Sequence, residues 1–211
     1  MQERTPISIA TSHVLIPERP DIPSNLWGKE ERIISERARD GDSDAFASLW
    51  AIYQPKLFRY VLARTHDIHK AQDRTSEIVI RALEGIAKYE QRGVPFAAWL
   101  FRIARNHLIS QHRREEVRSK SLTPLQLKDL SVPGDIDVEL EAITNLEFGR
   151  LIEQLQYLTS AQRDVISLRF VAGLSVGETA DVLGKKPTNV KVLQHKGLKR
   201  LRHLIGVSQA A

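Results

Sequence analysis

The chain has 211 residues, of which 42% are hydrophobic, and a formal net charge of +5. This length allows one large or two small domains, and the positive charge favours a polyanionic partner such as nucleic acid. Cysteine is absent, which excludes disulfides and thiolate metal sites and fits a reducing cytoplasm. No apolar run approaches the length of a membrane span, and we expect neither membrane insertion nor a secretory signal.

Residues 1–29 are predicted to form a disordered N-terminal extension, because prolines interrupt any helical period there. A helical pattern starts at about Glu30, and a long helix is expected after the turn at residues 40–42. Apolar side chains recur along this second helix at helical spacing, which indicates a core face. They are Phe46, Leu49, Trp50, Tyr53, Leu57, Tyr60 and Val61.

A third helix is expected over residues 71–90, with one apolar and one charged side. The apolar side carries Ile78, Val79, Ala82, Leu83 and Ile86. The charged side carries Asp73, Arg74, Glu77 and Arg81. Alternating charge of this kind either keeps a helix solvated or forms a docking surface, and the pattern leaves both open.

Residues 91–114 contain no Asp or Glu and interleave arginines with aromatic residues. This pattern suits single-stranded nucleic acid, because cations follow the phosphates and rings stack on unpaired bases. The aromatic side chains are Phe96, Trp99 and Phe101. The alternative is that Trp99, Leu100, Ile103 and Leu108 pack inward, and both can hold on opposite faces of one helix.

Residues 115–144 are predicted to be a linker, broken by prolines and acidic in its second half. Helical periodicity resumes at about Asn145 and leads to a helix-turn-helix. Ser175 and Glu178 have the capping-box spacing, Gly184 suits a helix end, and Pro187 suits the first turn of the next helix.

The helix that starts at Pro187 has two distinct faces. One is apolar and carries Val190, Leu193, Gly197, Leu201 and Leu204, whereas the other carries Lys191, His195, Lys199 and Arg202. Since no acidic residue occurs from 185 to 202, we expect this helix to lie in the DNA major groove. The alternative is an ordinary surface helix with a solvated basic stripe.

Nothing in the sequence points to catalysis. His66, Asp67, His69 and Asp73 lie close together in sequence, but no metal-binding helix motif surrounds them, and we expect a solvated loop. Phosphate-binding, nucleophile-elbow and dinucleotide motifs are absent from the sequence. We therefore expect no metal, no cofactor and no enzymatic activity.

The two modules, in this order, resemble regions 2 and 4 of bacterial RNA polymerase sigma factors of the sigma-70 family, extracytoplasmic-function (ECF) group. In the first module the likeness lies in DSDAFASLWAIYQPKLFRYV, AQDRTSEIVIRAL and KYEQRGVPFAAWLFRIARNHLISQHRR, and in the second in LTSAQRDVISLRFVAGLSVGETADVLG. It implies an all-α protein of two small helical domains and a flexible linker. Region 2 would span 30–114, the acidic linker 115–144, and region 4, with the helix-turn-helix, 145–206.

The resemblance also implies a function. Such a protein binds core RNA polymerase, at its β′ clamp and β flap, and directs promoter-specific initiation in the bacterial cytoplasm. The residues implied for the −35 element are Thr188, Asn189, Lys191, Val192, His195, Lys196 and Lys199. Those for the −10 element are Arg92, Trp99, Arg102, Arg105, Asn106 and Arg113, with an unpaired base held by the loop at residues 89–95. Those for core polymerase are Asp73, Arg74, Glu77 and Arg81.

Further partners implied are promoter DNA and an anti-sigma factor, which the family often has. The sequence departs from the family pattern at Arg74 and Ser76, where an apolar residue and Gln are usual, and at Lys186, where Ser is usual. The alternative function is a helix-turn-helix regulator that binds DNA without acting as a polymerase subunit. The usual receiver domain of such a regulator would show strands, and the first half of this sequence has no strand pattern.

Overall fold

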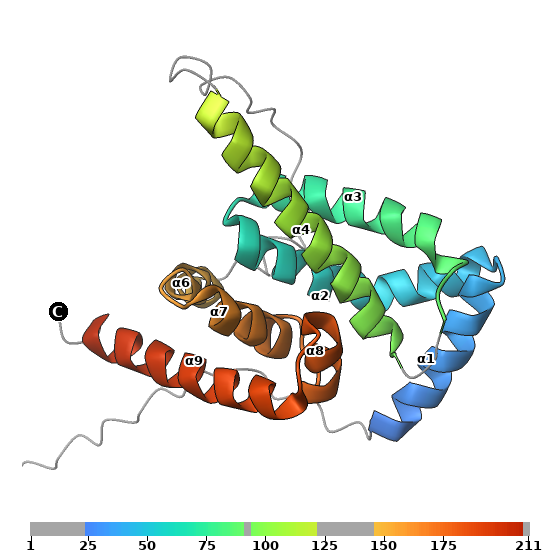
Figure 1. Cartoon of the computed structure of the whole chain (residues 1–211). Helices are drawn as coiled ribbons and strands as arrows, with labels where there is room; N and C mark the ends of the chain where they lie inside the picture. Colours follow the sequence, from blue (N-terminus) through green and yellow to red (C-terminus); the bar gives the residue numbers. More distant parts are fainter. Residues whose placement is uncertain (1–23, 91–93, 122–145, 209–211) are drawn as a thin grey trace, which may run out of the picture.

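The computed structural model describes residues 24–90, 94–121 and 146–208, with side chains for 30–90, 94–117 and 151–204. Within these ranges the chain forms helices and no strand, which confirms the all-α class expected from the sequence (Figure 1). In chain order they are α1 (Ser24–Arg39), α2 (Ser43–Thr65), α3 (Ile68–Ile86), α4 (Phe96–Ser121), α6 (Leu146–Leu155), α7 (Ser160–Ile166), the π-helical turn η2 (Ser167–Val171), α8 (Val176–Leu183) and α9 (Pro187–Ser208).

Helices α1 to α4 form the first module, in which α2 contacts each of the other three. Asp42 begins α2 because its carboxylate accepts hydrogen bonds from backbone N–H groups of the first turn, and Asp67 caps α3 in the same way. Between these helices His66 adopts a left-handed conformation with φ 54°. Pro55 lies inside α2 without dividing it.

The core of the first module follows the predicted apolar stripe. Phe46, Leu49, Tyr53, Leu57, Tyr60 and Val61 are buried, and Trp50 is half-buried. The rings of Tyr60 and Phe101 meet edge to face with their centroids 5.5 Å apart, which joins α2 to α4. The position of α4 on the module is therefore set by aromatic packing.

Two helices extend beyond the module boundaries expected from the sequence. Helix α1 starts at Ser24, inside the range assigned to the extension, and α4 continues to Ser121, inside the range assigned to the linker. The residues after Arg114 contain neither Pro nor Gly before Pro124, so nothing stops α4 at 114. The rest of the extension and the acidic half of the linker lie outside the described residues.

Helices α6 to α9 form the second module, and local signals set its helix ends. Capping boxes are formed by Thr159 with Gln162 and, as predicted, by Ser175 with Glu178. Gly184 ends α8 with φ 60°, again as predicted. At Gly197 a Cβ atom would lie 2.9 Å from Cγ1 of Ile166, so the missing side chain lets α9 approach α7 closely.

The two modules pack against each other. Helix α8 contacts α4 and η2 contacts α2, so the second module lies along one side of the first (Figure 1). Most buried apolar residues of both modules form one continuous cluster, and Val165, Ala180 and Val190 form a second, smaller one. The sequence predicted the modules but not this contact, because the periodicity of a helix shows which face is buried and not which element covers it.

Candidate nucleic-acid interface

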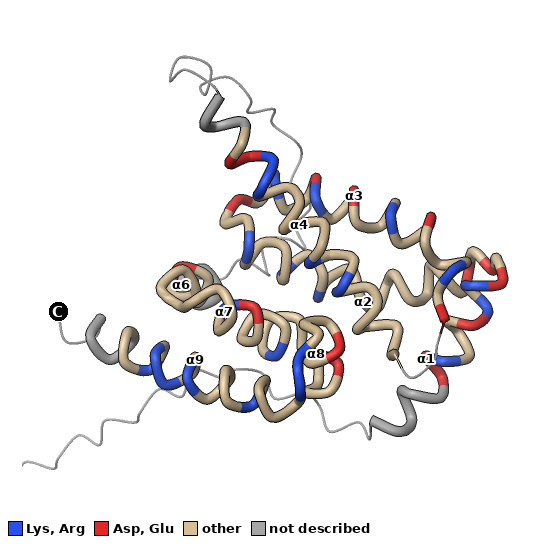
Figure 2. The backbone as a smooth tube through the Cα atoms, viewed as in Figure 1, with Lys and Arg blue, Asp and Glu red and all other residues tan. Residues whose placement is uncertain are grey.

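Helix α9 presents an exposed basic face and an apolar buried face. Val190 and Leu201 are buried at 0% and 5% exposure, which fixes the rotation of the helix on the module. All the residues predicted to recognise the −35 element are exposed: Thr188, Asn189, Lys191, Val192, His195, Lys196 and Lys199. Figure 2 shows Lys and Arg along α9 and no acidic residue. Its N-terminal half therefore combines cations with an exposed apolar side chain, Val192.

The residues of the second predicted surface, on α4, differ in their exposure. Arg102, Asn106 and Arg113 are exposed, whereas Arg105 and Trp99 are partly buried. Arg92 lies outside the described residues. The exposed members lie on the side of α4 opposite its buried residues Leu100, Phe101, Ala104 and Leu108.

The aromatic residues before and within α4 mostly pack together. Phe96 and Phe101 are buried at 2% and 0% exposure, so inward packing, not base stacking, describes both in this structure. Trp99 lies 5.2 Å from Tyr89 and 5.4 Å from Phe96, centroid to centroid. The Tyr89 hydroxyl donates to the carbonyl of Val94 at 2.8 Å and so ties together the two ends of the loop that precedes α4. The loop residues 91–93 are not described.

Helix α3 exposes part of what was expected to be its apolar side. Ile78 and Ala82 are buried as predicted, but the expectation that Leu83 faces inward is wrong, since its side chain is 50% exposed. Ile80, which lies outside the predicted apolar side, is 54% exposed. The buried face uses positions 71, 75, 78, 82 and 86, and Leu83 points about 100° away from it around the helix. Asp73 and Arg81 are exposed beside these apolar residues.

The other two residues predicted to bind polymerase, Arg74 and Glu77, take part in a network between α3 and α4. The Arg74 guanidinium donates to Glu77 at 3.0 Å and to Glu115 at 3.2 Å. Gln111 donates to Glu77 at 3.1 Å, and Nε2 of His107 lies 2.7 Å from the same carboxylate. Desolvation opposes ionisation of Glu77, yet Arg74 and His107 together lower its pKa. Burial lowers the pKa of His107 despite the attraction of Glu77.

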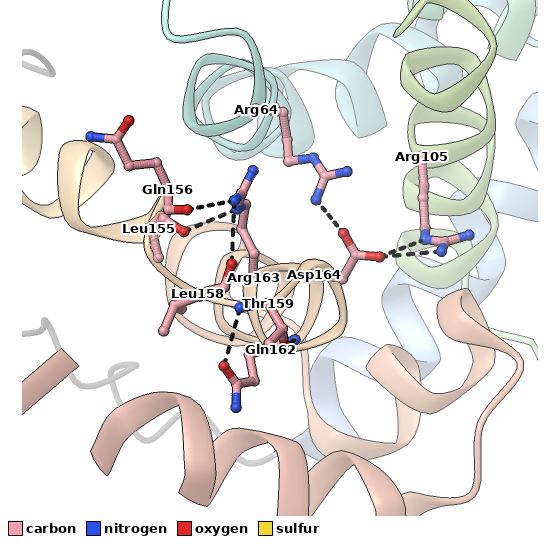
Figure 3. Close-up of polar contacts among 9 residues, drawn as sticks. All are labelled: Arg64, Arg105, Leu155, Gln156, Leu158, Thr159, Gln162, Arg163 and Asp164. Carbon is pink, nitrogen blue, oxygen red and sulfur yellow. Dashed lines mark hydrogen bonds and ion pairs between the residues drawn. The ribbon is translucent and has the colours of Figure 1, made fainter. Parts of the chain in front are cut away.

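An ion-pair cluster joins the two modules and includes Arg105, which the sequence singled out, together with Arg64 and Asp164, which it did not (Figure 3). Asp164 on α7 is buried, and its Oδ1 accepts from Arg64 at the end of α2. Its Oδ2 accepts from Nε and Nη2 of Arg105 on α4 at 3.3 and 3.2 Å. One carboxylate of the second module therefore contacts two arginines of the first. The three residues are far apart in sequence, which explains why no local pattern revealed their pairing.

Two of the four residues considered for a metal site have structural roles at helix ends. His66 and Asp67 form the turn between α2 and α3. Among the described residues no three His, Cys, Asp or Glu side chains are grouped as metal ligands would be. In the same ranges no helix has the length and apolar character needed to span a bilayer.

Both modules match models of known protein families. The family model of Sigma-70 region 2 matches residues 49–118, and that of Sigma-70, region 4 matches residues 155–203. The ECF RNA polymerase sigma factor SigD of Mycobacterium bovis is 30% identical over 184 residues, which cover 84% of this chain and 84% of that protein. The chain belongs to the ECF sigma factors.

Further relatives agree with this family. The ECF RNA polymerase sigma factor BldN of Streptomyces coelicolor is 34% identical over 171 residues, which cover 81% of this sigma factor and 64% of BldN, just under two thirds of its length. A solved structure of the sigma factor RpoE of Bartonella quintana, in complex with the anti-sigma factor NepR, superposes with a TM-score of 0.62. The identity is 23%, and the match covers 77% of this chain and 97% of that one, which supports the fold.

Proposed function

We propose that this sigma factor confers promoter specificity on bacterial RNA polymerase by recognising a −10 element with its first module and a −35 element with its second. The observation that carries the proposal is the presence, in one chain, of a region 2 module and a region 4 module whose α9 has an exposed and uniformly basic face. The chemistry of RNA synthesis belongs to the polymerase.

At the −35 element, α9 would enter the major groove with its N-terminal half. Lys191 and Lys196 can donate to guanine O6 and N7, and Val192 can contact a thymine methyl group. Lys199 and Arg202 lie further along the exposed face and suit phosphate contacts, which position the helix without recognising sequence.

At the −10 element, α4 and the loop before it would hold the non-template strand. Arg102 and Asn106 are exposed one turn apart, so they can follow one stretch of backbone. Unstacking a base costs a few kcal/mol, which stacking must offset. Because Trp99 packs against Tyr89 and Phe96, its ring would need to present its remaining open face or to rearrange. The role of the loop at 89–95 in capturing a base stays a prediction.

Docking to core polymerase is assigned to the outward face of α3. Asp73 and Arg81 supply charge there, and Ile80 and Leu83 supply exposed apolar surface that a partner would bury. Glu77 and Arg74 form an ion pair within the module, so their main role would be to hold α3 against α4 and not to contact the polymerase. Region 4 would dock on the β flap, as the family resemblance implies.

Three further points belong to this proposal. The acidic linker would thread a positively charged channel of the polymerase, an anti-sigma factor would bind the free protein, and the protein would act in the cytoplasm, where the chromosome lies. Residues 118–144 of the linker lie outside the described side chains.

Run-off transcription tests the proposed function. Core polymerase with the purified chain is given a library of genomic promoter fragments, and we expect transcripts from a small set of fragments that share −35 and −10 sequences. A helix-turn-helix regulator would bind fragments but leave core polymerase inactive, and that result would overturn the proposal.

A further inference from the structure

Arg64 and Arg105 converge on one point between the modules. They come from different helices of the first module and contact opposite oxygens of the same carboxylate, Asp164. Arg105 donates from both Nε and Nη2 to Oδ2, while Arg64 donates to Oδ1, so the two guanidinium groups together occupy both oxygens of one anion (Figure 3).

The arginines are held by the first module itself. Their helices are joined beside them by the edge-to-face contact of Tyr60 with Phe101, and Ala63 and Ala104, the neighbours of the two arginines in sequence, are fully buried. The two guanidinium groups should therefore stay close when the second module moves away. Two like charges at a partly buried position then need an anion, because an unpaired charge is costly there.

Two further groups mark this position as an anion site. The Tyr60 hydroxyl is buried, has no hydrogen-bond partner in the described part of the chain, and lies within the electrostatic influence of both arginines. Arg163 lies next to Asp164 and donates to the carbonyls of Leu155, Gln156 and Leu158, so a third cation borders the site in the packed form.

We propose that Arg64 and Arg105 together bind a backbone phosphate of the promoter strand, and that Asp164 occupies this site when the modules are packed together. A phosphodiester offers the same pair of anionic oxygens as the carboxylate. The inference rests on the proposed function, since Arg105 lies on α4 one turn from Arg102 and in the surface assigned to the −10 strand. It adds Arg64, on α2, to that surface as a residue that positions the strand.

DNA and Asp164 compete for the same two arginines, so packing of the modules and binding of the strand oppose each other. Removing the charge of Asp164 should therefore strengthen DNA binding, whereas removing Arg64 should weaken it even when Asp164 no longer competes.

The test uses the full chain and a fluorescein-labelled, 20-nucleotide single-stranded DNA of mixed sequence, titrated by fluorescence anisotropy over a series of KCl concentrations. We expect Asp164→Asn to bind at least about fivefold more tightly than the wild type, at the low end of typical coupling. In the Asp164→Asn background, Arg64→Gln should bind more weakly and lower the salt slope by about 0.7, the value for one phosphate contact to a single strand. Arg64→Lys should retain the slope, and Arg39→Gln, the same change on an exposed side chain of α1, should leave affinity nearly unchanged.

Two results would overturn the proposal: an Asp164→Asn variant that binds no more tightly than the wild type, or an Arg64→Gln change without effect on the slope in that background. If circular dichroism shows that Asp164→Asn is misfolded, the test compares the salt slopes of Arg64→Gln and Arg64→Lys in the otherwise wild-type chain. A lower slope for Arg64→Gln than for Arg64→Lys supports the phosphate contact, and equal slopes overturn it. Failure of the run-off assay with an intact slope difference would remove the sigma function and keep the phosphate site.

Discussion

The two surfaces assigned to DNA, on α9 and on α4, differ in how far other parts of the chain cover them or pair with their side chains. On α9 every predicted recognition residue is exposed. On α4 the predicted set is divided: Arg102, Asn106 and Arg113 are exposed, whereas Arg105 is paired with Asp164 of the other module and Trp99 packs in an aromatic group. The two helices are similar in sequence character, since both carry long stretches without acidic residues.

The difference follows from how many elements each helix packs against. Helix α4 contacts α1, α2 and α3 within its module and also α8 of the other module. The N-terminal half of α9 packs one face against its own module and exposes the other face to solvent. A basic face is thus open to DNA only where no acidic group from a distant element reaches it. The packed arrangement leaves the predicted −35 surface accessible and engages part of the predicted −10 surface.

The largest expected effect concerns the aromatic residues of α4. It tests whether they belong to the hydrophobic core or to a surface that binds nucleic acid. Phe101→Ala should lower the free energy of unfolding by about 3–5 kcal/mol, because the ring is fully buried against Tyr60. Arg102→Ala, at the neighbouring exposed position, should change it by less than about 0.5 kcal/mol and weaken binding of single-stranded DNA. Urea denaturation followed by circular dichroism measures the first quantity. A stable Phe101→Ala variant with weakened DNA binding would instead make Phe101 a stacking residue.

The next effect concerns the open surface on α9. Lys191→Ala should cost about 1–3 kcal/mol on the preferred −35 sequence and relax discrimination there, because a base contact is lost. Arg202→Ala, the matched control further along the helix, should weaken all duplexes alike and lower the salt slope by about 0.9. Titration of duplex variants over several salt concentrations separates the two. Equal weakening of every duplex by Lys191→Ala would make Lys191 a phosphate contact.

A smaller effect is expected at the third surface, the outward face of α3. Ile80→Ser should weaken assembly with core polymerase by about 1 kcal/mol without lowering the stability of the free protein, since the half-exposed side chain becomes buried only on binding. Ile33→Ser on α1 removes a similarly exposed side chain, at 57%, from another helix and is the control. Competition binding to core polymerase checks both. An Ile80→Ser variant with unchanged affinity would take this face out of the interface.

The smallest effect concerns the start of α4, where Glu31 of α1 accepts a hydrogen bond from the backbone N–H of Ala97 at 3.4 Å. Burial raises the pKa of Glu31, and repulsion from Glu178 of the other module adds to this, against hydrogen bonds from Tyr53 and Ala97 and the attraction of Lys56. The folded protein therefore keeps this proton to higher pH than the unfolded chain, and the stabilisation is lost as pH rises above the ordinary value of 4.5 through the raised pKa.

Glu31→Gln should remove that pH dependence and leave the protein slightly more stable at neutral pH, because the amide oxygen can still accept from Ala97. Thermal unfolding at several pH values between about 4.5 and 7 measures the change. The control is Glu30→Gln, an exposed position on the same helix. If Glu31→Gln leaves the pH dependence of stability unchanged, the pKa of the Glu31 carboxyl is not raised in the folded protein.

Much of the candidate site could be predicted from the sequence because its signals are local. The capping box of Ser175 and Glu178, the left-handed Gly184 and the inward face of α9 all lie within one or two helical turns, and all are confirmed. The family resemblance rests on the same local patterns, and the family is confirmed as well. The roles of individual residues in binding DNA and polymerase stay predictions.

The helices, their buried faces over most of their length and the charge of α9 follow from the sequence, because a periodic pattern depends on residues only three or four positions apart. Tertiary structure alone decided three things: that Ile80 and Leu83 of α3 face outward, that Phe96 and Phe101 belong to the core, and that Asp164 meets Arg64 and Arg105. The physical reason is that burial and pairing depend on which element covers a face. Arg64 and Asp164 are 100 positions apart in the chain, and only packing of the modules brings their charges together.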